Sequence, residues 1–179
     1  PRVRRQRQMC IRDRDADGLN ILAMHPQWMK FIGEQTILTP HMGEMSRLCG
    51  LDVSELKEDP VARAYQYAEK SGGVLVLKDA CTVVTDRNEK LYLNLSGNSG
   101  MATAGSGDVL SGIIASVLCM YLSCEEEREL SYKAAMAVYI HGLCGDIARE
   151  KKGSHGMTAK DMIEALPEVL KLAEVQSKG

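Results

Sequence analysis

The 179 residues have a formal net charge of −2, and 45% of them are hydrophobic while 26% are charged. This composition is typical of a single soluble globular domain, and no apolar run approaches the roughly 20 residues that a helix needs to span a bilayer. No signal peptide is visible in the given residues, and they contain no CxxC pair. The six cysteines therefore indicate reduced and mostly buried thiols of a cytoplasmic protein, neither a disulfide framework nor a zinc site.

Charge is distributed unevenly, because residues 1–14 contain six arginines and one aspartate while the rest of the chain is near −7. A basic arm can bind nucleic acid, but no aromatic side chains are interleaved here and nothing downstream is basic. We interpret residues 1–14 as a basic leader that is disordered or not native to the fold. The domain is expected over residues 15–179. We expect it to lack its native N-terminal part, because DADGLNIL (15–22) is typical of the interior of a fold.

Strand and helix patterns alternate along the chain. Residues 35–40 (QTILTP) form a short β-type run that ends in proline, and residues 41–50 have apolar side chains at helical spacing with a glycine as stop signal. The next helix is expected over residues 54–70, ended by two glycines. Residues 74–78 (VLVLK) form a continuous apolar run, which predicts a strand buried on both faces of a sheet.

The second half of the chain continues this alternation. The elements expected there are a hairpin of residues 81–85 and 90–95, and helices over 108–120 and from about 125 to 150. A last helix opens with Thr158 and Asp161, three residues apart, which is a variant of the capping box. Alternating strands and helices predict an α/β layered fold with a largely parallel central sheet flanked by helices.

The stretch GNSGMATAGSGDVLSGIIASVL, residues 97–118, places several glycines directly before a helix that begins with a single carboxylate, Asp108. Glycine allows a ligand to approach the backbone closely, and a helix N-terminus binds anions, so the loop is suited to phosphate. It matches neither GxGxxG nor GxxxxGK[ST], which excludes Rossmann and P-loop assignments. Asp108 is either a simple N-cap or a base that takes a proton from a hydroxyl attacking a phosphoryl group. The residues alone leave both interpretations open.

Residues 97–118 resemble the signature of the NAD(P)H-hydrate dehydratases, a branch of the ribokinase-like superfamily. Four further segments resemble motifs of this family and follow its order: DADGLNIL (15–22), ILTPHMGEMSRL (37–48), LKxxxT (77–82) and YIHGLCGDIA (139–148). GSGD alone is shared with small-molecule kinases, whereas GNxGMAT and TPHxGE narrow the resemblance to the NAD(P)H-hydrate dehydratases. It implies a ribokinase-like fold and a repair reaction. In that reaction NADHX and NADPHX are dehydrated to NADH and NADPH through a phosphorylated intermediate, with ADP or ATP as co-substrate and Mg²⁺ as cofactor.

The resemblance also implies roles for individual residues. Asp108 would be the catalytic base that activates the substrate hydroxyl for phosphorylation, and it would contact the substrate together with His41. Glu44 is a further candidate, assisting through magnesium or water. The residues whose N–H groups would bind phosphate are Gly105, Ser106 and Gly107. The nucleotide-binding residues that the resemblance implies are Lys78, Asp79, Ala80, Cys81, Thr82 and Gly107.

Two departures from the family pattern are present. Asp79 replaces a glycine that the family commonly has, and the N-terminal portion of the family's domain has no counterpart here. Two of the residues also have ordinary structural explanations. Lys78 follows a buried strand, where a surface lysine is common, and His141 lies in the middle of its helix, which is typical of a core or interface residue.

Two other functions remain open. One is a vitamin-precursor kinase of the same superfamily, and the other is an inactive fragment that binds nucleotide without turnover. The partners expected are small-molecule substrates and further copies of the chain in a homo-oligomer, with no nucleic acid and no membrane. Because the chain outside the leader is acidic, an anionic nucleotide would be bound by backbone N–H groups and magnesium more than by a basic surface.

Overall fold

A computed structural model describes residues 12–14, 17–123 and 128–176 of the chain. The chain divides into two compact units. The first is Pro1–Asp79 with Val83–Tyr92, and the second is Ala80–Thr82 with Leu93–Gly179. None of the described helices combines the length and the apolar character that a membrane span requires.

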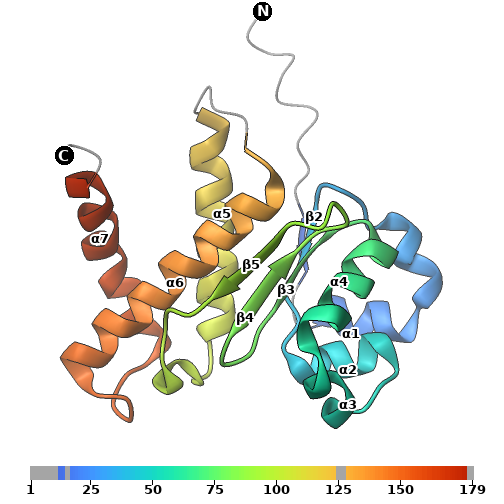
Figure 1. Cartoon of the computed structure of the whole chain (residues 1–179). Coiled ribbons are helices and arrows are strands. Elements are labelled where there is room, and N and C mark those ends of the chain that lie inside the picture. The colour runs from blue at the N-terminus through green and yellow to red at the C-terminus, as the bar shows by residue number, and fades with distance from the viewer. Residues whose placement is uncertain (1–11, 15–16, 124–127, 177–179) are drawn as a thin grey trace, which may run out of the picture. The chain divides into compact units, whose positions relative to one another are not determined.

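The described strands form one five-stranded sheet in the order β1-β2-β3-β4-β5 (Figure 1). Strands β1, β2 and β3 run parallel to one another, and β4 pairs antiparallel with β3. The strand bounds are Arg12–Arg14 (β1), Thr36–Leu38 (β2), Val74–Leu77 (β3), Thr82–Thr85 (β4) and Leu91–Asn94 (β5). The prediction of an α/β fold with a largely parallel sheet is confirmed. All four residues of β3 are buried, as its continuous apolar run indicates.

The first strand corrects the expected end of the basic leader. Arg12–Arg14 pairs in parallel register with Thr36–Leu38, so these three residues belong to the sheet. Strands pair through backbone groups, which is why the charged pattern RDR did not indicate a strand. Residues 1–11 lie outside the described residues, and so do Asp15 and Ala16 at the start of the DADGLNIL segment.

The helices of the first unit pack on strands β2 to β4. They are α1 (Asp17–Met24), the 3₁₀ helix η2 (Pro26–Phe31), α2 (Met42–Cys49), α3 (Val53–Glu58) and α4 (Pro60–Ser71). Figure 1 shows α1 to α4 on the same side of β3. The core between them and the sheet includes Leu38, Leu75 and Leu77 from the strands, and Leu22, Met45 and Tyr67 from the helices. This packing supports the ends of β2 and β3, where two of the predicted site residues lie.

The single helix predicted over residues 54–70 is wrong. Two helices, α3 and α4, meet at Asp59, whose φ of −150° and ψ of 80° are not helical. Pro60 disfavours the helical conformation of the residue before it and is itself suited to the first turn of a helix. Asp59 then caps α4, because its side chain accepts a hydrogen bond from Ala62 N at 2.9 Å. The predicted end of α4 is confirmed, since Gly72 follows it with a φ of 73°.

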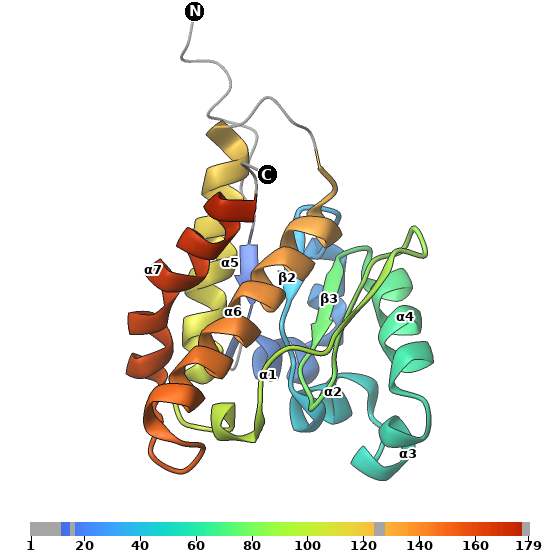
Figure 2. The ribbon, with the colours of Figure 1, turned by 60° about the vertical axis from the view of Figure 1, so that its left-hand side comes forward.

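The second unit contains the long helices α5 (Ser106–Ser123), α6 (Leu130–Lys152) and α7 (Ala159–Gln176), preceded by the short 3₁₀ helix η3 (Ser99–Met101). Helix α6 packs against both α5 and α7 (Figure 2). The helix predicted from about residue 125 begins at Leu130 instead. The expected capping pair at the start of α7 is confirmed, because Thr158 N donates to Asp161 Oδ2 at 2.8 Å.

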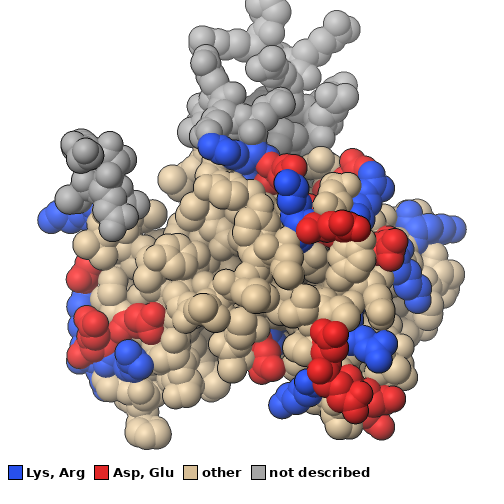
Figure 3. Space-filling model, in the orientation of Figure 1, with Lys and Arg blue, Asp and Glu red and all other residues tan. Residues whose placement is uncertain are grey.

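Acidic side chains gather over α3 and the start of α4, at the lower right of the face shown in Figure 3. The exposed acidic residues of these segments are Asp52, Glu55, Glu58 and Asp59. A surface of this sign repels an anionic nucleotide. An anionic ligand is therefore not expected on this surface.

The described cysteines differ in exposure. All four are free thiols: Cys144 is buried, Cys49 and Cys81 are half-buried, and Cys119 is exposed. Only one of the four described cysteines is buried, so the expectation of mostly buried thiols is wrong for this part of the chain. The apolar pattern of a helix does not specify which side of the helix is covered. Burial raises the pKa of the Cys144 thiol to about 11, which keeps it protonated and unreactive near neutral pH.

Candidate functional site

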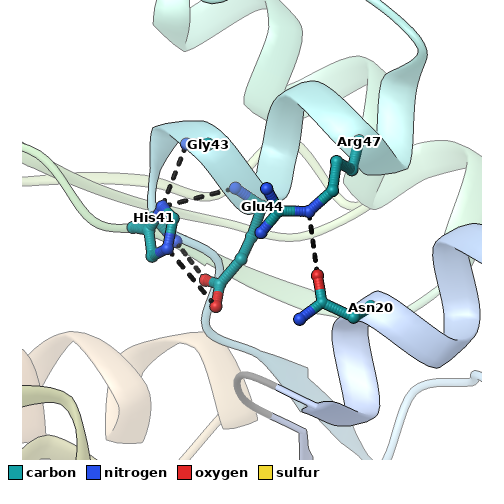
Figure 4. A network of polar contacts seen from close by, with 5 residues as sticks. All are labelled: Asn20, His41, Gly43, Glu44 and Arg47. Atoms are coloured by element: carbon teal, nitrogen blue, oxygen red, sulfur yellow. Dashed lines mark hydrogen bonds and ion pairs between the residues drawn. The ribbon is translucent and has the colours of Figure 1, made fainter.

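The segment TPHMGE places His41 after β2, at the start of α2 (Figure 4). His41 is the N-cap of this helix, because its Nδ1 accepts hydrogen bonds from Gly43 N at 2.9 Å and from Glu44 N at 3.3 Å. In return, His41 N donates to Glu44 Oε2 at 2.8 Å, which completes a capping box. Since Nδ1 accepts, the proton of the neutral imidazole lies on Nε2, 3.5 Å from Glu44 Oε1.

This network explains the residue types of the motif. A Cβ atom at Gly43 would lie 3.0 Å from Cε1 of His41, so glycine leaves room for the capping imidazole. Arg47 Nε donates to Asn20 Oδ1 at 2.8 Å and links α2 to α1. Glu44 is 5% exposed and both of its oxygens face His41, whose side chain is 54% exposed. The outer face of His41 is thus open to a ligand. Glu44 belongs to the cap, and its role through magnesium or water stays a prediction.

Lys78 lies beside His41 in the first unit. Lys78 N donates to Pro40 O at 2.8 Å, and His41 and Lys78 form an isolated parallel bridge beyond the ends of β2 and β3. Both residues therefore lie at the carboxyl ends of neighbouring parallel strands, the edge at which ligands bind in open α/β sheets. The structure brings these two predicted ligand-binding residues together.

Four further residues predicted to bind nucleotide lie in the turn after β3 and at the start of β4. Asp79 and Ala80 are exposed, Cys81 is half-buried, and Thr82 begins β4. Among the described residues, Glu89 is the one non-glycine residue with a positive φ, so Asp79 has an ordinary backbone conformation. The turn does not require the glycine that the family commonly has, and it accommodates Asp79 without backbone strain.

The glycine loop enters α5 through Gly105, whose φ of 85° favours glycine. Ser106 N and Val109 N donate to backbone carbonyl oxygens at 3.2 and 3.0 Å. Ser106 N is one of the three N–H groups predicted to bind phosphate, with those of Gly105 and Gly107, and it thus already has an acceptor within the chain. The N–H groups of Gly107 and Asp108 lie between those of Ser106 and Val109, in the first turn, where a helix has no acceptor of its own to offer. Together with the helix dipole, these groups form a site suited to phosphate.

Asp108 is not the N-cap that one of the two interpretations required. Helix α5 begins at Ser106, two residues earlier than predicted, so Asp108 is its third residue. The Asp108 side chain is exposed. A carboxylate in the first turn stabilises a helix through the dipole by about 0.3–1 kcal/mol. Its exposure also leaves it accessible to a substrate hydroxyl.

Helix α6 contacts the glycine loop through residues of the YIHGLCGDIA segment. His141 is 9% exposed, and its Nε2 donates to Ser106 O at 3.1 Å, so its interpretation as a core residue is confirmed. Asp146 accepts hydrogen bonds from Gly97 N at 2.9 Å and from Asn98 Nδ2 at 3.0 Å. Sequence reasoning missed Asp146. The available signal was a single carboxylate within an otherwise uncharged stretch of a buried helix.

Two glycines of α6 allow the loop to approach the helix closely. A Cβ atom on Gly142 would lie 2.8 Å from the backbone carbonyl carbon of Ser96. A Cβ atom on Gly145 would lie 2.6 Å from Cγ of Met101. The loop and the helix therefore pack with no space for a side chain at either position.

The predicted site residues fall into two groups, one in each unit. His41, Lys78 and Asp79 belong to the first unit, and residues 105–108 belong to the second, with which Ala80–Thr82 are also grouped. The first group lies at the carboxyl ends of parallel strands and the second at a helix N-terminus. Both are places at which α/β proteins bind ligands and anions.

Mg²⁺ fits this chain as an ion bound together with nucleotide phosphates. The described residues contain no group of three His, Cys, Asp or Glu side chains that would hold a metal ion on their own. Mg²⁺ commonly uses one or two carboxylates together with phosphates and water. Phosphate oxygens and water would supply the ligands of such an ion, and Asp108 stays available as the predicted base.

A glycine loop that opens a helix with an exposed carboxylate, in a fold with a largely parallel sheet, is typical of a ribokinase-like protein. Structural comparison confirms this class. A ribokinase-like superfamily protein from Enterococcus faecalis V583 matches with a TM-score of 0.72 and 28% identity, over 89% of this chain and 51% of that one. The chain belongs to the NAD(P)H-hydrate dehydratase family, since the sequence model of that family matches residues 3–168. The matched region includes most of the basic leader.

Individual relatives show how much of a whole enzyme the chain represents. The bifunctional NAD(P)H-hydrate repair enzyme Nnr of Thermofilum pendens is 43% identical over 157 residues, which are 88% of this chain and 29% of that enzyme. The ADP/ATP-dependent NAD(P)H-hydrate dehydratase of Bacillus subtilis, co-crystallised with ATP and Mg²⁺, is 35% identical with a TM-score of 0.68. That match covers 76% of this chain and 47% of the other. The chain thus spans less than a third of the first relative and about half of the second.

Proposed function

We propose that this chain forms part of an ADP- or ATP-dependent NAD(P)H-hydrate dehydratase, which returns NADHX and NADPHX to NADH and NADPH. Membership of the family supports this proposal, and so do relatives that are named for this reaction. The observation that supports it most directly is the position of Asp108. This exposed carboxylate lies in the first turn of α5, directly after the glycines that leave N–H groups available for phosphate.

The proposed reaction has two steps. Asp108 removes the proton from the substrate hydroxyl while the hydroxyl oxygen attacks the terminal phosphorus of the nucleotide. A new O–P bond forms, and the bond from that phosphorus to the remaining nucleotide breaks. Phosphate then leaves with the electron pair of its C–O bond while a proton is lost from the adjacent carbon, which forms the double bond of the reduced nicotinamide ring. Phosphorylation is needed because phosphate leaves far more readily than hydroxide.

The chain's other candidate residues would bind and orient the two substrates. The N–H groups of Gly107 and Asp108, with the dipole of α5, would stabilise charge on the transferring phosphoryl group. Lys78 and residues 79–82 would line the nucleotide site, and the exposed face of His41 would contact the hydrated nicotinamide nucleotide. Mg²⁺ bound to the nucleotide would neutralise phosphate charge. The proposal includes the assembly of both groups of residues into one site.

The test is turnover of hydrated NADH by a full-length protein that contains this chain, with ADP or ATP supplied. We expect absorbance at the reduced-nicotinamide wavelength to recover, with one nucleotide cleaved for each cofactor restored. A stable phosphorylated product without recovered absorbance would identify a small-molecule kinase. Nucleotide binding without any turnover would identify an inactive protein. Either result would contradict the proposal.

We also propose a cytoplasmic location and a homo-oligomer. Light scattering would detect the homo-oligomer.

A further inference from the structure

The loop that leads to Asp108 is attached to α6 at its start. Gly97 N and Asn98 Nδ2 donate to the two oxygens of Asp146, at 2.9 and 3.0 Å, and both bonds are part-buried. Asn98 Oδ1 also accepts a hydrogen bond from Gly100 N at 3.0 Å, at the beginning of η3. One carboxylate therefore satisfies two donors, and Asn98 connects it to the next turn of the loop.

The other end of the loop is also attached to α6, because His141 donates to Ser106 O. Hydrogen bonds to an ionised acceptor are stronger than those between neutral groups, and partial exclusion of water strengthens them further. Between the two attachments lies Gly105, with its φ of 85°, directly before the first turn of α5. The position of that turn therefore depends on a loop bound to α6 at both ends.

We propose that Asp146 is a positioning residue for phosphoryl transfer. By orienting Gly97 and Asn98, it fixes the loop that places Asp108 and the phosphate-binding N–H groups of α5. Asp146 acts through the loop and not on the reacting atoms. This inference rests on the proposed function and adds to it a residue that determines the geometry of the site.

The hydrogen-bond pattern provides the test. In Asp146→Asn, the new amide group would present its NH₂ to the NH₂ of Asn98, and in Asn98→Asp two carboxylates would face each other. In the double variant, donor and acceptor exchange places. The amide at position 146 then donates to the carboxylate at position 98, which still accepts from Gly100 N, and the amide oxygen accepts from Gly97 N.

Two measurements are made on each variant: amide hydrogen exchange of residues 97–104 without ligand, and kcat with hydrated NADH. We expect each single variant to exchange faster in this loop and to lose about 10- to 100-fold in kcat, the scale of effect when reacting groups are misplaced by about 1 Å. The double variant should recover both properties. The matched control is Asp86→Asn, because this buried carboxylate accepts from Asn88 N at 2.8 Å and Lys90 N at 3.3 Å in the turn after β4. We expect it to keep the parent loop exchange and kcat.

The inference would be overturned if the effects of the two single variants on loop exchange and kcat were additive in the double variant. The inference would also be overturned if the loop exchanged at the same rate in Asp146→Asn and in the Asp86→Asn control. Faster exchange with an unchanged kcat would also overturn it, since Asp146 would then order the loop without positioning the site. A parent protein that does not turn over hydrated NADH contradicts the proposed function instead. In that case, the amide exchange of the loop and the nucleotide affinity of the same variants test the role of Asp146.

Discussion

Replacing Gly142 by alanine tests how closely the glycine loop packs on α6. The new Cβ would lie 2.8 Å from the backbone carbonyl carbon of Ser96, whereas carbon atoms make unstrained contact at about 3.5–4.0 Å. The loop would therefore have to move by roughly 1 Å. This movement would weaken the hydrogen bond of Ser96 Oγ to Tyr139 O, now 3.3 Å, and that of Gly97 N to Asp146.

The magnitude follows from two opposing effects. Alanine is favoured over glycine inside a helix by about 0.5–1 kcal/mol, whereas overpacking costs about 1–3 kcal/mol. Gly142→Ala should therefore lower the free energy of unfolding by up to about 2 kcal/mol. Gly112→Ala in α5 is the matched control, because its Cβ would meet nothing within 4 Å, and it should gain the full helix preference. Gly145→Ala should fall between them, since its obstacle is the flexible side chain of Met101.

Thermal unfolding of the three variants, followed by circular dichroism, measures the order of their stabilities. For a chain of this size, 1 kcal/mol corresponds to a shift in Tm of about 2–4 °C. We expect Gly112→Ala to melt above the parent, Gly145→Ala near it and Gly142→Ala below it. If Gly142→Ala raised Tm as much as Gly112→Ala, the close packing of loop and helix would be refuted.

Two further predictions concern titratable groups. Hydrogen bonds from Thr158 lower the pKa of Asp161, so its stabilising contribution is complete above the unfolded pKa of about 4 and is lost as pH falls through the folded pKa. Asp161→Asn should therefore lower Tm at pH 7, and the difference from the parent should shrink below about pH 4; a constant difference would argue against this. Iodoacetamide at pH 8 should label the exposed Cys119 in the folded protein but not the buried Cys144, whose pKa is raised to about 11, and peptide mapping checks this.

Local sequence signals predicted much of the secondary structure. Gly50 and Gly72 end α2 and α4 with φ values of 68° and 73°, as expected of glycine after a helix. The apolar run 74–77 forms the buried β3. The break between α3 and α4 was missed because apolar spacing continues across it. Pro60 outweighs this spacing, since it disfavours the helical conformation at Asp59.

The candidate functional residues divide in the same way. His41, Lys78 and the glycine loop belong to contiguous motifs and were predicted from the sequence. The contacts of Asp146 with Gly97 and Asn98 join residues 49 and 48 positions apart, so no local pattern indicates them. The role of Glu44 in the capping box was also missed, because its spacing from His41 suits a shared ligand and a cap equally well. The structure shows the cap, through the orientation of the imidazole.

The central claim is that Asp108 is the catalytic base of a nucleotide-dependent dehydration. It is tested most directly by Asp108→Asn in a full-length protein that contains this chain, with recovery of reduced-nicotinamide absorbance from hydrated NADH as the readout. We predict that turnover falls by about 10²–10⁴-fold, the usual contribution of a positioned general base. Nucleotide affinity should hold or improve, because a negative charge near the phosphates is removed. Stability should change by no more than about 1 kcal/mol, the value of a carboxylate in the first helical turn. Turnover at the parent rate would contradict the claim, and Asp108 would then serve only the start of α5.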